Sequence, residues 1–413
     1  MAVITPFRAL RPAPASASAV AAVPYDVVNT DEARALAAGN PLSFLHVSRA
    51  EIDLPPDTNP YDDAVYAKAV ENFDTLKARA PLVLEDTPTL YVYRLRMGAH
   101  LQTGIAGAFS VDDYDRDVIK KHERTRRDKE DDRTRHILEL RAQTGPVFLV
   151  HEPSPGVDRA VERTIGAPTL FDFTAVDGVQ HTVWRVAAND ERELIAAFGA
   201  MPALYIADGH HRAASAARAR QHLREAASRG SGIGDRSPAE CDRFLAVAFP
   251  GAQTQILPYN RVVKDLGRYT PDSLLAALRQ RLTVKPGPAT PARKGEVAMF
   301  LAGAWHTVEM TPAPAGTDPA GQLDVSRLHD LVLAPLLGIG DVRTDKRIDF
   351  VGGARGTAQL ESLVSSGRAA VAFSMHPVGV DDLMQISDSG GIMPPKSTWF
   401  EPKLRDGLLS HVI

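Results

Sequence analysis

The sequence has very little cysteine, no long hydrophobic run and no large excess of charge, and each of these absences excludes a class of protein. The single cysteine, Cys241, can form neither an intrachain disulfide nor a cysteine-based zinc site. No stretch approaches the roughly 18 apolar residues of a membrane span. A net charge of -4, from 47 basic and 51 acidic residues, would not hold the chain on nucleic acid or on an anionic membrane. We therefore expect a cytoplasmic protein that has no membrane span and does not bind nucleic acid.

Several familiar motifs are also absent. The chain has no G-x-S-x-G, H-E-x-x-H or G-x-G-x-x-G pattern, which disfavours common hydrolases and Rossmann dehydrogenases. The stretch GGIMPPKST (390–398) looks like a phosphate-binding P-loop, but Pro395 stands at the second glycine position and has no N–H to donate. Pro6, Pro12 and Pro14 likewise interrupt any amphipathic helix in residues 1–26, which we expect to be strand and loop rather than a targeting peptide.

What is present is an ordinary globular composition. At 413 residues with 44% hydrophobic content, the chain is long enough for two or three domains with sizeable cores. Alternating and helical patterns mix along the whole length, which predicts an α/β fold of mixed α+β type. The expected hairpins cover 90–111, 169–186 and 295–310; the expected strands cover 146–152, 202–207, 243–251 and 369–378; the expected helices lie within 119–145, 191–201, 211–229, 271–282 and 324–338, with loops at 228–238 and 311–322.

The stretch YIADGHHRAASAAR (205–218) carries the clearest functional signal. An apolar strand runs through Asp208-Gly209 directly into an alanine-rich helix, so unpaired backbone N–H groups and the positive helix end meet at the edge of the sheet. Gly209 permits a tight turn. Arg212 adds a planar fork that suits phosphate oxygens, and His210 and His211 add further polar groups. The combination predicts a phosphate-binding turn.

Two other interpretations of this turn remain open. Asp208 could simply cap the helix while the histidines lie on a solvated turn. Alternatively, Asp208, His210 and His211 could bind a metal ion, although adjacent histidines point in different directions and a further ligand would have to come from elsewhere.

A second candidate region is the charged stretch HERTRRDKEDDR (122–133). The usual interpretation is a solvated helix with i,i+4 ion pairs. Phosphoryl transfer, however, needs cations near the transferred group and a carboxylate that accepts the hydroxyl proton. Glu123 and His122 are therefore candidate catalytic residues, and the candidate phosphate contacts are Arg124, Arg127 and Lys129.

The N-terminal region supplies candidate substrate contacts. Ser48, Arg49 and Glu51 are expected where a strand runs out, a position from which side chains reach a cleft. Arg49 could bind the carboxylate of an amino acid and Glu51 its ammonium group, whereas surface ion pairing is the alternative. The remaining candidate substrate contacts are Tyr25, Asp26 and Lys396.

The turn resembles the nucleotide-binding loop of the ParB/sulfiredoxin superfamily. Because His210 stands where sulfiredoxins use a cysteine, sulfiredoxin chemistry is not expected. More of the chain resembles the bacterial and archaeal family known as domain of unknown function 1015, which in this loop is similar to free serine kinases. The matching segments are ITPFRALRP (4–12), VPYDVVN (23–29), NPLSFLHVSRAE (40–51), KKHERTRRDKEDDRTRHI (120–137), GPVFLVH (145–151), YIADGHHRAASA (205–216), LPYNRVV (257–263) and MPPKSTWFEPKL (393–404).

This resemblance implies a function, a cofactor set and a domain division. It implies ATP- and Mg²⁺-dependent phosphorylation of free L-serine to O-phosphoserine, with Asp208 and Arg212 acting at the reacting phosphate. It also implies a ParB-like nucleotide-binding core over 1–250 and a C-terminal α+β portion over 251–413 that completes or covers the cleft. A nucleotide-binding regulatory switch and a metal-dependent hydrolase are the alternative functions.

Overall fold

The computed structural model describes residues 1–80, 82–230 and 239–413. The chain forms two compact units, one from Met1–Thr254 with Pro402–Ile413 and the other from Gln255–Glu401. The predicted division had placed all of 251–413 in one C-terminal portion, whereas the last 12 residues belong to the first unit. Of the predicted loop at 228–238, residues 231–238 lie outside the described residues, and 228–230 continue a helix.

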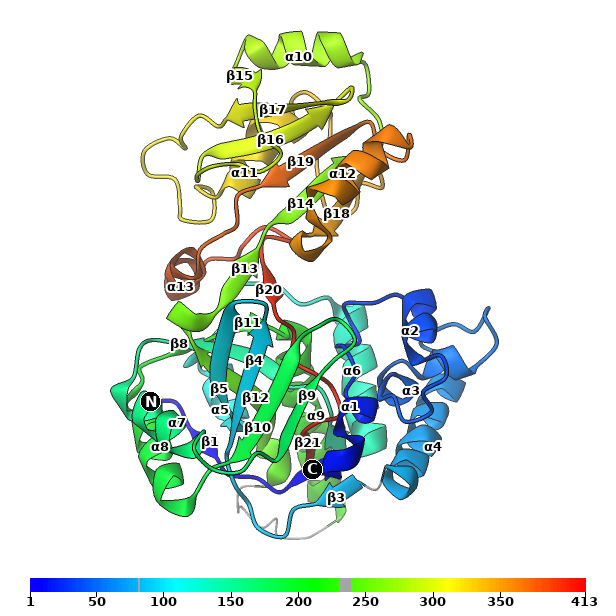
Figure 1. The fold of residues 1–413 in the computed structure, drawn as a ribbon, viewed down its shortest axis with the longest axis vertical. Coiled ribbons are helices and arrows are strands. Elements are labelled where there is room, and N and C mark those ends of the chain that lie inside the picture. Colours follow the sequence, from blue (N-terminus) through cyan, green and yellow to red (C-terminus); the bar gives the residue numbers. More distant parts are fainter. Residues whose placement is uncertain (81, 231–238) are drawn as a thin grey trace. The chain divides into compact units, whose positions relative to one another are not determined.

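The first unit is built on a nine-stranded mixed sheet in the order β6-β11-β8-β12-β5-β4-β10-β9, with β1 beside β5 (Figure 1). Its strands are β1 (Ile4–Thr5), β4 (Tyr91–Met97), β5 (His100–Ser110), β6 (Ile119–Lys120), β8 (Val147–His151), β9 (Phe171–Thr174), β10 (Gln180–Arg185), β11 (Leu204–Asp208) and β12 (Arg243–Pro250). The predicted hairpins at 90–111 and 169–186 are present because Gly98 and Gly178, with φ of 58° and 80°, form their turns.

The helices of the first unit are α1 (Ala17–Val20), α2 (Thr30–Ala37), α3 (Leu45–Ser48), α4 (Asp63–Arg79), α5 (Val111–Asp115), α6 (Arg127–Leu140), α7 (Pro155–Thr164), α8 (Ala188–Ala200) and α9 (His210–Gly230). Helices α5, α7, α8 and α9 contribute residues to the core of the nine-stranded sheet. Phe198 of α8 and Ala213 of α9 pack with strand residues such as Leu149 and Ile206 in the main core. A second core lies among α2, α3 and α4, around Phe44 and Phe73. The two cores hold α9 and the α3 region in fixed positions on the same unit.

The C-terminal segment returns to this unit. A small sheet in the order β3-β2-β21-β7 joins β2 (Ala9–Pro12), β3 (Leu82–Leu84), β7 (Ala142–Gln143) and β21 (Ser410–Val412). The buried side chains of Leu408 and Leu409 precede β21. Residues 402–413 are therefore tied to the N-terminal strands by both backbone pairing and packing.

Two local expectations are corrected, and one helix was missed. Residues 119–120 form a strand and α6 begins only at Arg127, so Glu123 precedes the helix instead of sharing a helical face with Arg127. The cause is that residues 122–126 are held against α9, where the ring of His211 accepts a hydrogen bond from the Arg126 N–H at 3.0 Å. Ser48 ends helix α3 and Glu51 lies in a 3-10 turn, so neither follows a strand. Helix α4 was not predicted.

The second unit has its own six-stranded sheet in the order β15-β17-β16-β19-β14-β18, and a two-stranded ribbon of β13 and β20. Its elements are β13 (Gln255–Leu257), β14 (Tyr259–Val263), α10 (Pro271–Arg279), β15 (Thr283–Pro286), β16 (Glu296–Leu301), β17 (Ala304–Glu309), α11 (Asp324–Leu328), β18 (Ile348–Gly352), α12 (Gly356–Ser365), β19 (Val371–Met375), α13 (Val380–Asp388) and β20 (Trp399–Glu401). The predicted helix at 324–338 is shorter, because a π-helical turn at His329–Leu333 follows α11. Val262, Leu360 and Ala372 belong to the core of this unit.

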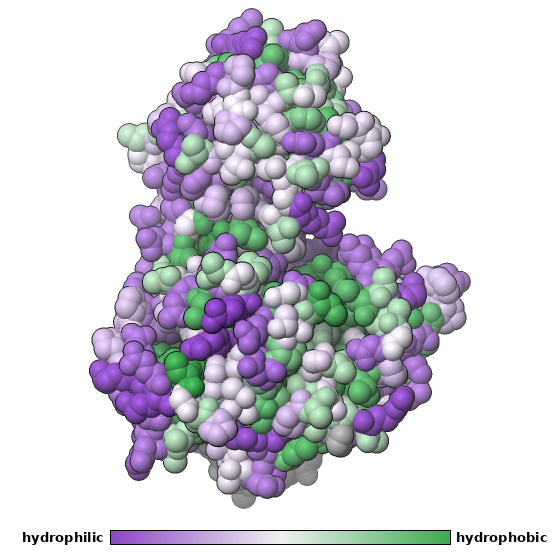
Figure 2. Space-filling model, viewed as in Figure 1, coloured by the Kyte–Doolittle hydropathy of each residue, from purple (hydrophilic) through white to green (hydrophobic). Residues whose placement is uncertain are grey.

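The mixed α/β fold class predicted from the sequence is confirmed by these elements. Hydrophilic residues are spread over both units in Figure 2 and are interspersed with hydrophobic ones, as is usual for protein surfaces. Among the described residues, no helix combines the length and the apolar character that crossing a membrane requires.

Candidate functional site

The candidate site forms where two neighbouring parallel strands end. Strands β6 and β11 are paired in parallel, with Leu204 opposite Ile119 and Tyr205 opposite Lys120. Residues that follow the carboxyl ends of adjacent parallel strands lie at the same edge of the sheet. The predicted turn at 208–212 therefore meets the segment that begins at His122, although the two are more than 80 residues apart in sequence.

The backbone of the turn depends on Gly209. Its φ is 94°, a region that L side chains rarely adopt, and a Cβ here would lie 2.9 Å from Cζ of Arg212. Helix α9 starts at the next residue, and Ala213 is the first residue whose N–H bonds back to the Gly209 carbonyl, at 3.0 Å. The preceding N–H groups of the first turn have no intrahelical partner. Anion binding at these N–H groups stays a prediction.

Arg212 is buried at the centre of the site, with only 7% of its surface exposed. One guanidinium nitrogen donates to the Pro146 carbonyl, and Nη2 lies 3.4 Å from Asp208 and 3.7 Å from Asp26. Burial opposes the charge, but these carboxylates hold the pKa of Arg212 above its usual value. Among the described residues, Nε and Nη2 of Arg212 have no hydrogen-bond partner of normal geometry. Such buried donors call for a ligand or ordered water.

Asp208 is engaged by two cations. Nζ of Lys403 lies 3.2 Å from its Oδ2, and Arg212 lies on the same oxygen. Burial would raise the pKa of Asp208, but the two cations hold it well below its usual value. Asp208 is therefore ionised at neutral pH and fixes both cations at the turn.

The two histidines of the turn have different neighbours. His210 is 4% exposed, and its Nε2 accepts a weak hydrogen bond from the His122 N–H at 3.4 Å. Its Nδ1 lies 3.9 Å from Oε2 of Glu123. His211 accepts from the Arg126 N–H, and burial lowers its pKa. The metal site considered from the sequence, with Asp208, His210 and His211, does not match these contacts, because Asp208 and His211 already have other partners.

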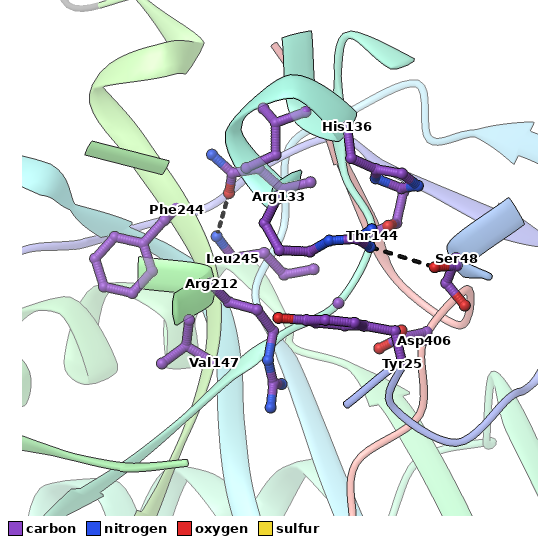
Figure 3. Close-up of a pocket in the computed structure, with 13 residues that line it drawn as sticks. Tyr25, Ser48, Arg133, His136, Thr144, Val147, Arg212, Phe244, Leu245 and Asp406 are labelled. Atoms are coloured by element: carbon purple, nitrogen blue, oxygen red, sulfur yellow. Dashed lines mark hydrogen bonds between the residues drawn. The ribbon is translucent and has the colours of Figure 1, made fainter. Parts of the chain in front are cut away.

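A small cavity of about 40 Å³ lies next to Arg212 (Figure 3). Tyr25 and Ser48 line it, and the Arg133 guanidinium stacks 4.2 Å from the centroid of the Tyr25 ring. Asp406 also lines it; burial raises the pKa of this carboxyl to about 7, although Arg212 pulls it down. A cavity of this volume holds one or a few water molecules, so it is a polar pocket that a larger group could enter only if its walls moved.

Of the other residues predicted from the sequence, some lie at the turn and others do not. Asp26 reaches Arg212, as described above, whereas Arg49 and Glu51 form an ion pair with each other at 2.9 Å. Lys129 donates to Tyr61 at 2.8 Å. Arg124 and Arg127 are exposed, and among the described residues no contact joins their side chains to the turn. Lys396 belongs to the second unit, with Nζ 5.4 Å from the Tyr259 ring centroid.

The family model described as "Protein of unknown function (DUF1015)" matches residues 4–326. The chain belongs to this family. No curated protein matches it.

Several solved structures resemble part of the chain. "Free serine kinase in complex with AMP" is 12% identical, with a TM-score of 0.35, and the match covers 74% of this chain and 92% of that one. A conserved hypothetical protein from Pyrococcus furiosus is 14% identical, with a TM-score of 0.35 and coverage of 75% and 95%. SbnI with C-terminal truncation from Staphylococcus aureus is 12% identical, with a TM-score of 0.38 and coverage of 74% and 87%. Likeness at this level does not extend to ligands or activity.

Three residues of the candidate site were not among the residues predicted from the sequence. Arg133 stacks on Tyr25, Lys403 contacts Asp208, and Asp406 lines the cavity. The EPKL stretch that contains Lys403 lies within a segment that resembles the family, and this was the available signal. Lys403 and Asp406 also lie beyond residue 326, where the family match ends.

Proposed function

We propose that this protein is a kinase that transfers a phosphoryl group from ATP to the hydroxyl of free L-serine, giving O-phosphoserine and ADP. The observation that carries the proposal is the buried Arg212, whose Nε and Nη2 have no hydrogen-bond partner among the described residues. Arg212 lies in the first turn of α9, where backbone N–H groups have no intrahelical partner. A guanidinium and helix N–H groups together suit the β- and γ-phosphates of a nucleotide. The motif resemblance to free serine kinases favours serine as the acceptor.

In this reaction the serine hydroxyl oxygen attacks the γ-phosphorus while the bond from that phosphorus to the β,γ-bridging oxygen breaks. ADP leaves, and the hydroxyl proton passes to a carboxylate. Glu123 is the proposed acceptor of that proton, because its side chain is 45% exposed beside the start of α9, 3.9 Å from His210. Arg212 and Lys403 would balance the charge of the transferring group.

Magnesium, if bound with the nucleotide, would neutralise phosphate charge. Mg²⁺ prefers oxygen ligands, and the carboxylates that face the turn are Asp26, Asp208 and Glu123. Asp208 is already paired with Lys403 and Arg212. The phosphates would therefore hold most of the ion's coordination.

Arg49 and Glu51 are the proposed contacts for the carboxylate and ammonium groups of serine. Their mutual ion pair would have to open when the amino acid binds, since each group can then exchange its partner for the complementary charge of the zwitterion. Thr30 hydrogen-bonds to both side chains, at 3.0 Å and 3.3 Å, and would keep them in place.

The test is an incubation of purified protein with ATP and each amino acid singly, with ADP and O-phosphoserine followed by mass spectrometry. Parallel reactions with ADP and with pyrophosphate identify the phosphoryl donor. We expect product only with L-serine, and a loss of about 100-fold or more in kcat for Glu123→Gln. Glu139→Gln, an exposed carboxylate on α6, is the matched control and should retain activity. ADP release that is indifferent to every amino acid would overturn the kinase and point to a nucleotide-dependent switch.

A further inference from the structure

Three potential metal ligands gather beside the turn. His122 and Glu123 follow the end of β6 at Lys120, and His210 follows the end of its parallel neighbour β11 at Asp208. One potential ligand atom from each of the three residues lies within 4.8 Å of the other two. Atoms bound about 2.1 Å from one ion lie roughly 3–4 Å apart. Small side-chain rotations would therefore bring all three onto a common ion.

The two imidazoles are buried close together. Their ring centroids are 4.4 Å apart and the rings are nearly perpendicular, at 84°. His122 is 2% exposed, yet neither of its ring nitrogens has a hydrogen-bond partner of normal geometry among the described residues. A buried polar ring without partners is costly unless something binds it.

The contact that competes with a metal at His210 is weak. Among the described residues, His210 Nε2 takes part only in the 3.4 Å bond from the His122 N–H, which is long for a hydrogen bond. Glu123 is half-exposed, so its carboxylate can turn without disturbing the core. The exposed side of the cluster would leave coordination positions open to water or to a phosphate oxygen, as in catalytic rather than structural metal sites.

We propose that His122, Glu123 and His210 form a binding site for one divalent first-row transition metal ion. Two imidazole nitrogens and one carboxylate suit ions such as Mn²⁺, Fe²⁺, Co²⁺ or Zn²⁺, whereas Mg²⁺ favours a set made wholly of oxygen. The site does not require the kinase reaction. A carboxylate bound to a metal through one oxygen keeps its second oxygen for the acceptor hydroxyl, so the two proposals are compatible.

The experiment uses the full-length protein, first stripped of metal with a chelator and then titrated with Co²⁺ in the absence of nucleotide. Binding is followed by the visible absorption of the bound ion and by equilibrium dialysis. We expect one Co²⁺ per chain, displaced by an equivalent of Zn²⁺ and not by a tenfold excess of Mg²⁺. Glu123→Gln and His210→Asn should each weaken Co²⁺ binding at least tenfold. His222→Asn, an exposed histidine on the same helix, should bind as the wild type does.

Circular dichroism on each variant shows whether its fold is retained. Because Glu123 is half-exposed, Glu123→Gln is the variant expected to disturb the fold least. Absence of stoichiometric binding in the wild type, or equal binding by folded Glu123→Gln, would overturn the metal site. Because no nucleotide or amino acid is present, the result is separate from the kinase assay. A protein that binds Co²⁺ but never phosphorylates serine refutes the proposed function alone.

Discussion

At the scale of single residues, the site depends on a buried cation surrounded by carboxylates. Arg212 and Asp406 are buried, whereas Asp26 and Asp208, which also lie beside Arg212, are partly exposed. Removing one partner of a buried charge network leaves the others uncompensated, which typically costs about 3–5 kcal/mol. The same residue therefore serves stability and, in the proposed function, phosphate binding.

This dual role decides which substitution at Arg212 is informative. We expect Arg212→Ala to lower the free energy of unfolding by about 3 kcal/mol, so that lost activity would not by itself identify the site. Arg212→Lys keeps the charge but loses the planar fork. It should leave the free energy of unfolding within about 1–2 kcal/mol of the wild type while nucleotide affinity falls. Urea denaturation and ATP titration of the two variants check this; equal ATP affinity in wild type and Arg212→Lys would contradict the role of the guanidinium.

The raised pKa of Asp406 predicts that the stability of the protein depends on pH. Its pKa is about 7 in the folded protein and near 3.9 when unfolded, so the folded state holds the proton more tightly. Its contribution to stability is complete below about pH 4 and is lost as the pH rises to about 7. Between pH 5 and pH 8 the free energy of unfolding of Asp406→Asn should fall less than that of the wild type, by on the order of 1–3 kcal/mol. The free energy of unfolding of both proteins is measured by urea denaturation at each pH. If it changes with pH equally in the wild type and in Asp406→Asn, the raised pKa is contradicted.

At the scale of elements, local signals predicted more than long-range ones. The hairpins followed from glycine turns that lie within a few residues of the strands they join, and the strand–turn–helix at 205–218 followed from its own residues. Lys403, by contrast, reaches Asp208 across 195 residues, and no local pattern encodes such a contact. The start of α6 was misplaced because the tertiary bond between Arg126 and His211 overrides the helical pattern of the preceding charges. Helix α4 was missed although its buried residues Val65, Ala69 and Phe73 recur with helical spacing.

The turn before α9 can be tested through its glycine. Gly209→Ala places a Cβ both in an unfavourable φ region and 2.9 Å from Cζ of Arg212, and we expect it to cost about 2–3 kcal/mol of stability. It should also reduce nucleotide affinity, because Arg212 must move. Gly178 is a matched control, since its φ is 80° and no atom lies within 4 Å of a Cβ there; Gly178→Ala should cost about 1 kcal/mol and leave nucleotide binding unchanged. Similar losses at both positions, measured by urea denaturation, would show that Arg212 does not constrain the turn.

At the scale of the whole molecule, the second unit is an insertion into the first. Its ends, β13 and β20, pair with each other, with Gln255 opposite Glu401. The chain therefore leaves the first unit and returns to it at neighbouring points. The part that returns, residues 402–413, carries Lys403 and Asp406 to the candidate site. A sequence division at 250 could not reveal this, because the returning segment is short and its partners are distant in sequence.

Deleting the second unit tests whether the first unit folds by itself. Replacing 255–401 by a short glycine–serine link should leave a first unit that unfolds in one cooperative thermal transition, because its cores and sheets are internal to it. A chain that ends at Thr254, and so lacks both the second unit and residues 402–413, should melt about 10 °C lower or more than the linked deletion. It loses β21 and the buried Leu408 and Leu409, which the linked deletion keeps. Equal melting temperatures by calorimetry would contradict the structural role of 402–413.

A phosphate site at the Asp208–Arg212 turn is tested most directly by calorimetric titration of ATP into the intact protein. We expect saturable binding at one site per chain, weakened at least tenfold in Arg212→Lys and unchanged in Arg281→Ala, which changes an exposed arginine of the second unit. Failure of the wild type to bind ATP, ADP or pyrophosphate, or equal affinity in both variants, would contradict a phosphate site at the Asp208–Arg212 turn.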